Sequence, residues 1–294
     1  MCLKSARILP FAWIAAYSIA VPAAPAQESA KPDAKKETFL RVNLLPVGDF
    51  PVTGAIIVND RPVVIMPKPS ELIPNPVFLK KGKDYLPLNI GLNAPSAPVR
   101  RPIGSTLDIM TRKDDGNYDG YVTVTLPEGK EDTTVFLLRN KESRSWLDTP
   151  RTIVFKNGVE SFPLGSARLI NFSTVSLRAT VNDKDYIVPP KSFKVIADLA
   201  KQGGETYCTY AIVAKIGERN LTLANTAVAF DAPSRMNLLM YDRDGKSEIR
   251  QEGDDRPVKI VKYFELPYVP PPDPSAPEPQ DVSTPTATAT PAVP

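Results

Sequence analysis

The chain has 294 residues, of which 42% are hydrophobic and 23% are charged, and this is the composition of a folded protein with room for two domains of ordinary size. It contains no histidine, which excludes serine–histidine and cysteine–histidine catalysis, histidine-ligated zinc and histidine-based pH switching. The formal net charge of +3 at pH 7 is too small to indicate a nucleic-acid-binding protein, so we expect no nucleic-acid partner.

The N-terminus has the features of an export leader. Lys4 and Arg7 precede an apolar stretch from Ile8 to Val21, and Ala24-Pro-Ala26 supplies the small residues that a signal peptidase reads. The apolar stretch is shorter than the roughly 20 residues that a membrane span needs. We therefore expect a cleaved signal peptide at 1–26 and a mature chain without a membrane span, located in the periplasm, outside the cell or on its surface.

The mature chain is predicted to be all-β. Residues 27–38 are polar and predict a flexible lead-in, and from Phe39 onward short β-branched and aromatic runs alternate with turn signals. The clearest alternation is Gly120-Tyr-Val-Thr-Val-Thr-Leu126, in which successive side chains point to opposite faces. The other strands are predicted at 39–45, 53–58, 62–66, 105–111, 133–139, 151–156, 166–172, 175–181, 206–216, 220–230, 236–242 and 257–265.

Two parts of the chain echo each other. Arg41-Val-Asn-Leu-Leu45 followed by Val58-Asn-Asp60 matches Arg168-Leu-Ile-Asn-Phe172 followed by Val181-Asn-Asp183. The runs 134–138 and 152–155 match 236–240 and 258–264 in the same order. This pattern predicts two tandem immunoglobulin-like β-sandwich modules at 39–160 and 161–266, and the alternative is chance similarity between strands.

Two other segments of the chain are rich in proline. The segment 61–103 carries nine prolines, and because proline donates no hydrogen bond to a ladder, we expect edge strand or ordered loop there, not central sheet. This Pro-rich insert is either a partner-binding surface or packing that protects a sheet edge. Residues 267–294 form a Pro-rich tail, predicted to be disordered and to act as a spacer or a weak docking site.

Two further features of the sequence, the stretch 192–202 and Cys208, are assigned no chemical role. The apolar spacing from Ser192 to Gln202 fits a helix and a strand equally well. Only Cys208 remains after leader cleavage, so the mature chain has no intrachain disulfide, and its apolar surroundings predict a buried, inert thiol.

The motifs that resemble binding sites have simpler interpretations. Asp115-Gly-Asn-Tyr-Asp-Gly120 matches the first half of a calcium loop, but Leu126 stands where the closing acid belongs. We predict a tight turn between two strands there, and another at Asp242-Arg-Asp-Gly245. Tyr118, Tyr121 and Trp146 are either a sugar-stacking surface or core and turn-adjacent aromatics.

The run Phe162-Pro-Leu-Gly-Ser-Ala-Arg-Leu-Ile-Asn-Phe172, with the later Pro189-Pro-Lys-Ser192, resembles a pattern in secreted two-module β proteins of Verrucomicrobia-type bacteria. The resemblance implies an exported β-sandwich protein and supplies no catalytic residues. We expect a non-enzymatic structural or interaction protein of the cell envelope or surface, whose partner is an envelope protein or a surface polymer. No catalytic, cofactor-binding or metal-binding residue is assigned. The alternatives are a carboxylate-dependent polysaccharide hydrolase or carbohydrate-binding protein, and a subunit of a surface fibre.

Overall fold

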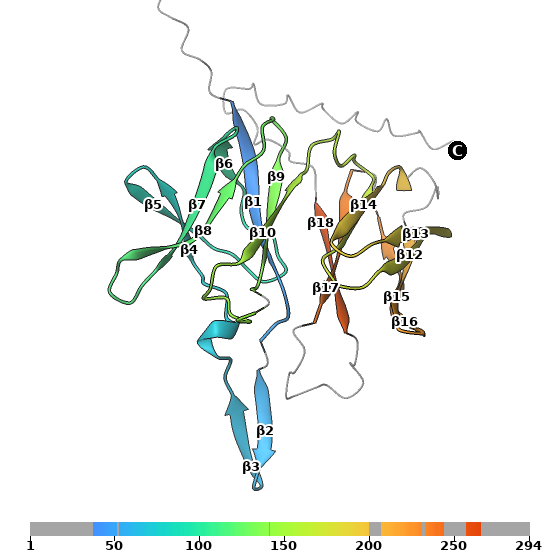
Figure 1. Cartoon of the computed structure of the whole chain (residues 1–294), viewed down its shortest axis with the longest axis horizontal. Coiled ribbons are helices and arrows are strands. Elements are labelled where there is room, and N and C mark those ends of the chain that lie inside the picture. Colours follow the sequence, from blue (N-terminus) through green and yellow to red (C-terminus); the bar gives the residue numbers. More distant parts are fainter. Residues whose placement is uncertain are drawn as a thin grey trace, which may run out of the picture. The chain divides into compact units, whose positions relative to one another are not determined.

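The protein is all-β, as the sequence predicts (Figure 1). The computed structural model describes residues 38–51, 53–140, 142–199, 207–230, 233–243 and 257–265. Within these ranges the bounded elements are 18 strands and one short 3-10 helix, η1, at Pro69–Glu71. No helix in the described part of the chain is long and apolar enough to cross a membrane. The predicted leader at 1–26, nearly all of the lead-in and the tail at 267–294 lie outside the described residues.

Eight strands form a first sandwich of two four-stranded sheets. One sheet has the order β10-β9-β1-β6 and contains β1 (Phe39–Val47), β6 (Val99–Pro102), β9 (Thr133–Leu138) and β10 (Arg151–Lys156). The other has the order β5-β4-β7-β8 and contains β4 (Val77–Lys81), β5 (Asp84–Leu88), β7 (Thr106–Arg112) and β8 (Tyr118–Thr125). β1 and β9 run parallel, and the other neighbouring pairs are antiparallel.

The next eight strands form a second sandwich with the same connections. One sheet has the order β14-β11-β17-β18 and contains β11 (Ala167–Asn171), β14 (Ser192–Ile196), β17 (Arg235–Asp242) and β18 (Val258–Glu265). The other has the order β13-β12-β15-β16 and contains β12 (Leu177–Val181), β13 (Lys184–Val188), β15 (Tyr207–Ile216) and β16 (Arg219–Ala229). Here β11 and β17 are the parallel pair.

The repetition extends to an irregularity in the ladder. The register shifts directly after Ile109, which opposes Leu79, and directly after Ile212, which opposes Ala179. A β-bulge therefore stands at the equivalent position of both sandwiches, where it increases the local twist of the strand pair. The two sandwiches thus share strand order, the parallel pair and the bulge.

Three clusters of buried side chains hold the described chain together. One fills the first sandwich around Val42, Leu107 and Trp146, and one fills the second around Leu169, Ile212 and Leu238. The third lies between the two sandwiches, with Leu45, Val47, Phe136, Leu138 and Phe155 from the first and Ile170, Phe172, Leu239, Tyr241 and Tyr263 from the second. The two sheets that contribute to this third cluster are buried on both faces, which explains their continuous apolar runs.

The two facing sheets meet in opposite strand order. Phe155 of β10 packs edge-to-face on Phe193 of β14, with ring centroids 5.0 Å apart. Phe136 of β9 contacts Phe172, directly after β11, at 5.4 Å in the same way. Since β10 corresponds to β18 and β14 to β6, equivalent strands lie at opposite ends of this interface. This is the arrangement of a two-fold interface between identical subunits.

A separate hairpin has no counterpart in the second sandwich. β2 (Gly54–Val58) and β3 (Arg61–Ile65) pair only with each other and form a two-stranded sheet (Figure 1). Asn59 and Asp60 form its turn and both have positive φ, as Asn182 and Asp183 do in the β12–β13 turn. The predicted match between these two turns is wrong, because the strand order aligns the β12–β13 hairpin with β4–β5 instead.

The prediction for the Pro-rich insert is partly wrong. Pro62, Pro87 and Pro102 do lie in strands that have a sheet neighbour on one side only, as expected. However, β4 lies inside its sheet, between β5 and β7. Residues 77–81 contain no proline, so the constraint on their neighbours does not apply to them. The first five residues of the ambiguous stretch 192–202 form strand β14, residues 197–199 do not belong to this strand, and residues 200–202 lie outside the described part.

Candidate functional site

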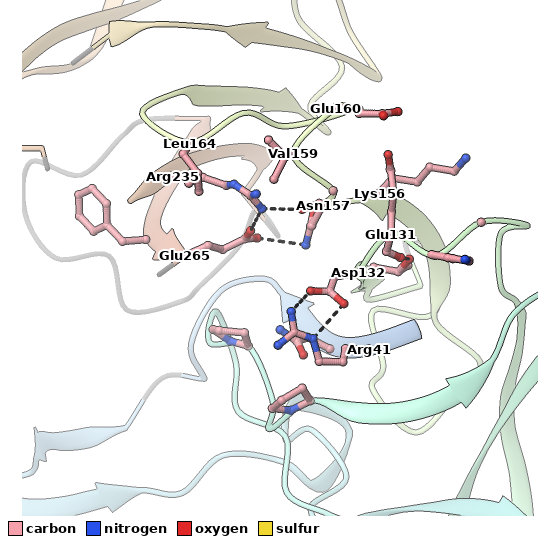
Figure 2. A pocket seen from close by; sticks show the side chains of 18 residues that line it. Arg41, Glu131, Asp132, Lys156, Asn157, Val159, Glu160, Leu164, Arg235 and Glu265 are labelled. Atoms are coloured by element: carbon pink, nitrogen blue, oxygen red, sulfur yellow. Dashed lines mark hydrogen bonds and ion pairs between the residues drawn. The ribbon is translucent and has the colours of Figure 1, made fainter. Parts of the chain in front are cut away.

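A pocket of about 990 Å³ opens where the first sandwich meets the segment leading to the second (Figure 2). Its walls come from the start of β1, the turn before β9, the segment after β10 and the end of β18. Its charged lining is evenly divided between bases and acids, which are Arg41, Lys130, Lys156, Arg235, Glu131, Asp132, Glu160 and Glu265.

Glu265 is the most heavily bonded carboxylate of this pocket. Its Oε1 accepts hydrogen bonds from Asn157 Nδ2 at 3.3 Å, Asn237 Nδ2 at 3.2 Å and Tyr263 Oη at 3.2 Å. Its Oε2 lies 3.9 Å from Arg235 Nη1. Burial raises the pKa of Glu265, and the nearby charges of Arg168 and Arg235 act in the opposite direction.

Arg168 lies behind this carboxylate and is 2% exposed. Its guanidinium donates to Asn237 Oδ1 at 3.1 Å, to Asn157 Oδ1 at 2.6 Å and to the carbonyl of Lys156 at 3.3 Å. The same group lies 4.0 Å from the ring centroid of Phe162. Burial lowers the pKa of Arg168. Because its partners belong to both sandwiches and to the segment between them, this network fixes the junction.

Opposite Glu265, the pocket wall is an ion pair between Arg41 of β1 and Asp132. Arg41 Nε donates to Asp132 Oδ1 at 2.9 Å, and Arg41 Nη2 pairs with Asp132 Oδ2 (Figure 2). Glu131 accepts a hydrogen bond from Ser161 Oγ at 2.6 Å and passes close to Gly158, where a Cβ would lie 2.4 Å from Glu131 Cγ. A glycine at 158 therefore makes room for this side chain.

The chemistry available to the pocket is that of carboxylates, amides and bases. A buried carboxyl with a raised pKa, such as that of Glu265, is a suitable proton donor. The hydrogen bonds to Glu265 are typical of a structural network, however. They occupy the carboxylate that an acid catalyst would need for its substrate. No group of three or more potential metal ligands occurs in the described residues.

The β2–β3 hairpin has the opposite character, since its side chains are apolar and uncovered. Ile57, Val64 and Met66 are 77%, 67% and 76% exposed, and Val58 and Val63 are also exposed. Antiparallel pairing places Ile57 beside Pro62 and Ala55 beside Val64 on one face, and Val58 and Val63 on the other. Both faces of the ribbon are therefore apolar, which is typical of strands that are covered on both sides.

The three aromatic residues that the sequence offers for sugar stacking lie in different surroundings. Trp146 is fully buried, and Tyr121 is buried and donates to the Trp146 carbonyl at 2.8 Å. These two side chains cannot stack on a sugar, so they are core residues. Tyr118 stacks on Tyr85 with centroids 3.9 Å apart and an interplanar angle of 6°.

The predicted turn between the antiparallel strands β7 and β8 is confirmed at residues 113–117, but the last three residues of the predicted connection, 118–120, belong to β8. Asp115 Oδ1 accepts from the Asn117 amide at 2.9 Å, which leaves this carboxylate engaged in the turn itself. Asp242 ends β17, and Asp244 and Gly245 lie outside the described residues. Cys208 is buried, and burial raises its pKa to about 11, so the thiol is not a nucleophile at neutral pH.

Sequence reasoning missed the residues that matter most at the junction. Arg168 was part of a predicted strand and carried one usable signal, a charged residue inside the apolar run Ala167-Arg-Leu-Ile170. Asn157 and Glu265 carried none, because their partners lie far away in the sequence. No protein-family model matches this chain, and no curated protein sequence is significantly similar to it.

Proposed function

We propose that this protein is a non-enzymatic interaction protein of the bacterial cell envelope or surface, and that it binds a partner protein through the β2–β3 hairpin. The observation that carries the proposal is an isolated ribbon with uncovered apolar side chains on both faces. A two-stranded hairpin is marginally stable by itself in water, and exposed apolar patches mark interaction sites. A partner that covers both faces would stabilise the ribbon and bury Ile57, Val64 and Met66.

The backbone of the hairpin favours a protein over a lipid surface. Val58 and Arg61 flank a two-residue turn and exchange hydrogen bonds, so the following pairs alternate. The backbone groups of Ala55 and Ile57 therefore point away from β3. Lipid hydrocarbon offers such groups no hydrogen-bond partner, whereas a partner strand pairs with them. On β3 the equivalent edge lacks one donor because of Pro62, so we propose β2 as the edge that a partner uses.

The proposed location follows from the sequence. The leader-like residues 1–26 support export. We also propose that the two modules are immunoglobulin-like, and the resemblance to secreted proteins of Verrucomicrobia-type bacteria supports the same location. Tandem sandwiches commonly act as rigid carriers for loops and ribbons that make contacts. In this protein the element that would make the contact is the β2–β3 hairpin, which lies between β1 and β4 in the chain.

The test compares the mature full-length chain with an Ile57→Asp/Val64→Asp variant in photo-crosslinking to the native envelope fraction. Both side chains are exposed, so the variant should keep the wild-type circular dichroism spectrum and melting temperature. We expect a defined crosslinked species that this variant loses. Ile187→Asp is the matched control, since Ile187 is an exposed apolar residue on β13, and it should retain the species. Identical crosslinking by all three proteins would contradict the proposal.

A second candidate function is hydrolysis of an exported polysaccharide, and the raised pKa of Glu265 within the pocket favours it. In this mechanism Glu265 would donate the proton and Glu131 would act as the second carboxylate, because Asp132 is engaged in the ion pair with Arg41. The measurement is release of reducing ends from envelope polysaccharide by the mature protein, with Glu265→Gln and Glu131→Gln as variants. Activity lost in both variants would support it, and no release by the wild type would exclude it.

A further inference from the structure

A second concave site lies between two sheet edges. Strand β10 has a sheet neighbour only in β9, and β14 only in β11. Phe155 and Phe193 bring these two edges together, and the groove between them has a volume of about 500 Å³. Its apolar surface comes mainly from Phe155, Ile170, Phe172 and Phe193, and Phe193 is 55% exposed. An exposed aromatic ring above an apolar floor is suited to a ligand with flat, rigid apolar faces.

The charge of this groove has one sign. Lys156 and Lys191 lie at its rim, Arg168 lies at its base, and none of its lining residues is acidic. Arg168 is committed to the buried network of the junction, so the two lysines are the groups that remain exposed to an incoming ligand. The groove thus favours an apolar ligand that also carries negative charge.

The chain itself supplies such a segment. Residues 266–294 contain three acids, Asp273, Glu278 and Asp281, and no base. Around the first two acids the sequence is Pro270-Pro-Pro-Asp-Pro-Ser-Ala-Pro-Glu-Pro279. Pro-rich segments adopt extended polyproline conformations whose ring faces dock on aromatic-lined grooves at little entropic cost. Charge and shape therefore both match the groove.

The connection to the fold places this segment within reach. The described chain ends at Glu265, which lines the large pocket together with Lys156, and Lys156 also lines the groove. Four residues separate Glu265 from Pro270, and the five steps between these two positions span roughly 15 Å in an extended chain. Because the segment is tethered so near, its effective concentration at the groove is on the order of millimolar.

We propose that residues 270–279 of the tail dock in the groove between β10 and β14 of the same chain. Their prolines pack on Phe155 and Phe193, and Asp273 and Glu278 pair with Lys156 and Lys191. The inference does not depend on the β2–β3 hairpin or on any external partner, so it stands or falls separately from the proposed function.

The test is zero-length carbodiimide crosslinking of the mature full-length chain, followed by peptide mass spectrometry. This reagent joins a carboxylate to an amine only when the two groups are in contact. We expect Asp273 and Glu278 to crosslink mainly to Lys156 and Lys191. Phe193→Ser leaves both lysines in place and should lower the yield of these crosslinks at least fivefold. Ile187→Ser, at an exposed apolar residue outside the groove, is the matched control and should leave the yield unchanged.

The proposal also depends on whether the crosslinks form within one chain and on which lysines they reach. Mixing protein labelled with nitrogen-15 and unlabelled protein distinguishes crosslinks within a chain from those between chains, and we expect no mixed-isotope pairs. Tail crosslinks spread evenly over other lysines, such as Lys83 and Lys215, would overturn the proposal. So would a yield that Phe193→Ser does not change, or crosslinks that join two copies.

Discussion

Tyr241 Oη donates a hydrogen bond of 2.9 Å to the carbonyl of Gly48, which joins the two sandwiches across 193 positions of sequence. Tyr241 belongs to β17, and Gly48 directly follows β1. Both lie at the cluster between the sandwiches, where water has little access to the carbonyl. Asn93 Nδ2 donates to the same carbonyl at 2.8 Å, so two hydrogen bonds satisfy a backbone acceptor that the docking of two sheets has removed from solvent.

Replacement of Tyr241 by phenylalanine tests that bond. It keeps the ring and removes only the donor, so we expect the free energy of unfolding to fall by about 1 kcal/mol. Urea denaturation of a chain that comprises residues 27–294 measures the loss. Tyr207→Phe, at an exposed tyrosine of β15, is the control and should change stability by less than about 0.5 kcal/mol. Equal stability of the two variants would show that the hydrogen bond from Asn93 Nδ2 is enough for the Gly48 carbonyl.

The cluster between the sandwiches should make them unfold together. Trp146 is buried in the first sandwich and is the only tryptophan that remains once residues 1–26, which contain Trp13, are removed. Its fluorescence and the far-ultraviolet dichroism of the whole chain should therefore change at the same urea concentration. Leu239→Ala, in the centre of this cluster, should cost about 2–5 kcal/mol. Leu86→Ala, at an exposed leucine, should cost little, and two separated wild-type transitions would refute the shared cluster as a coupling element.

The raised pKa of Glu265 predicts a pH dependence with a definite sign. Below the ordinary glutamate pKa of about 4.3, the side chain is neutral in both folded and unfolded chains. As the pH rises above that value, the unfolded chain loses this proton first, and the folded chain holds it up to its raised pKa. The wild type should therefore lose stability relative to Glu265→Gln across that window. Urea denaturation of both proteins between pH 3.5 and 8 measures the difference, which should stay constant above the window.

The β12–β13 turn offers a stabilising substitution. Asp183 has φ of 64°, a conformation that glycine adopts without the steric cost of a Cβ. Asp183→Gly should raise the free energy of unfolding by about 0.5 kcal/mol. The contrasting variant is Asp185→Gly, inside β13, which loses a 2.6 Å hydrogen bond from Thr180 and should be destabilised. A thermal melt of both variants separates a turn-specific gain from a general effect of glycine.

Most of the strands could be predicted because their side chains alternate or form apolar runs. Residues 122–126 are an example, since Val124 and Leu126 are buried and Thr123 and Thr125 are exposed. Tyr121 was predicted on the face of Thr123, but it is buried because it is the extra residue of the β-bulge opposite Ile109 and Met110. The strands at 77–81, 84–88, 99–102 and 184–188 were missed, and the stretch that contains 192–196 was left undecided between helix and strand. The first three lie in the Pro-rich segment 61–103, and the last, Lys-Asp-Tyr-Ile-Val, has two charged residues and edge exposure in place of a clear pattern.

The candidate sites could not be predicted in the same way. Arg41 and Asp132 meet although 91 positions separate them, and Asn157 meets Glu265 across 108. Strand pairing decides such meetings, and local sequence does not encode it. The hairpin is different, because its two strands were predicted from their residues. The local sequence could not indicate that these two strands would be left uncovered by another sheet.

The opposite order of equivalent strands in the two facing sheets has a consequence for how such a chain can be built. A single sandwich of this design would present Phe136, Leu138 and their neighbours to water, and a second copy rotated by half a turn would cover them. Joining the two copies in one polypeptide turns a concentration-dependent association into a permanent one. It also leaves the two halves independent in sequence, so that the first can carry an apolar ribbon after its first strand where the second has a short connection.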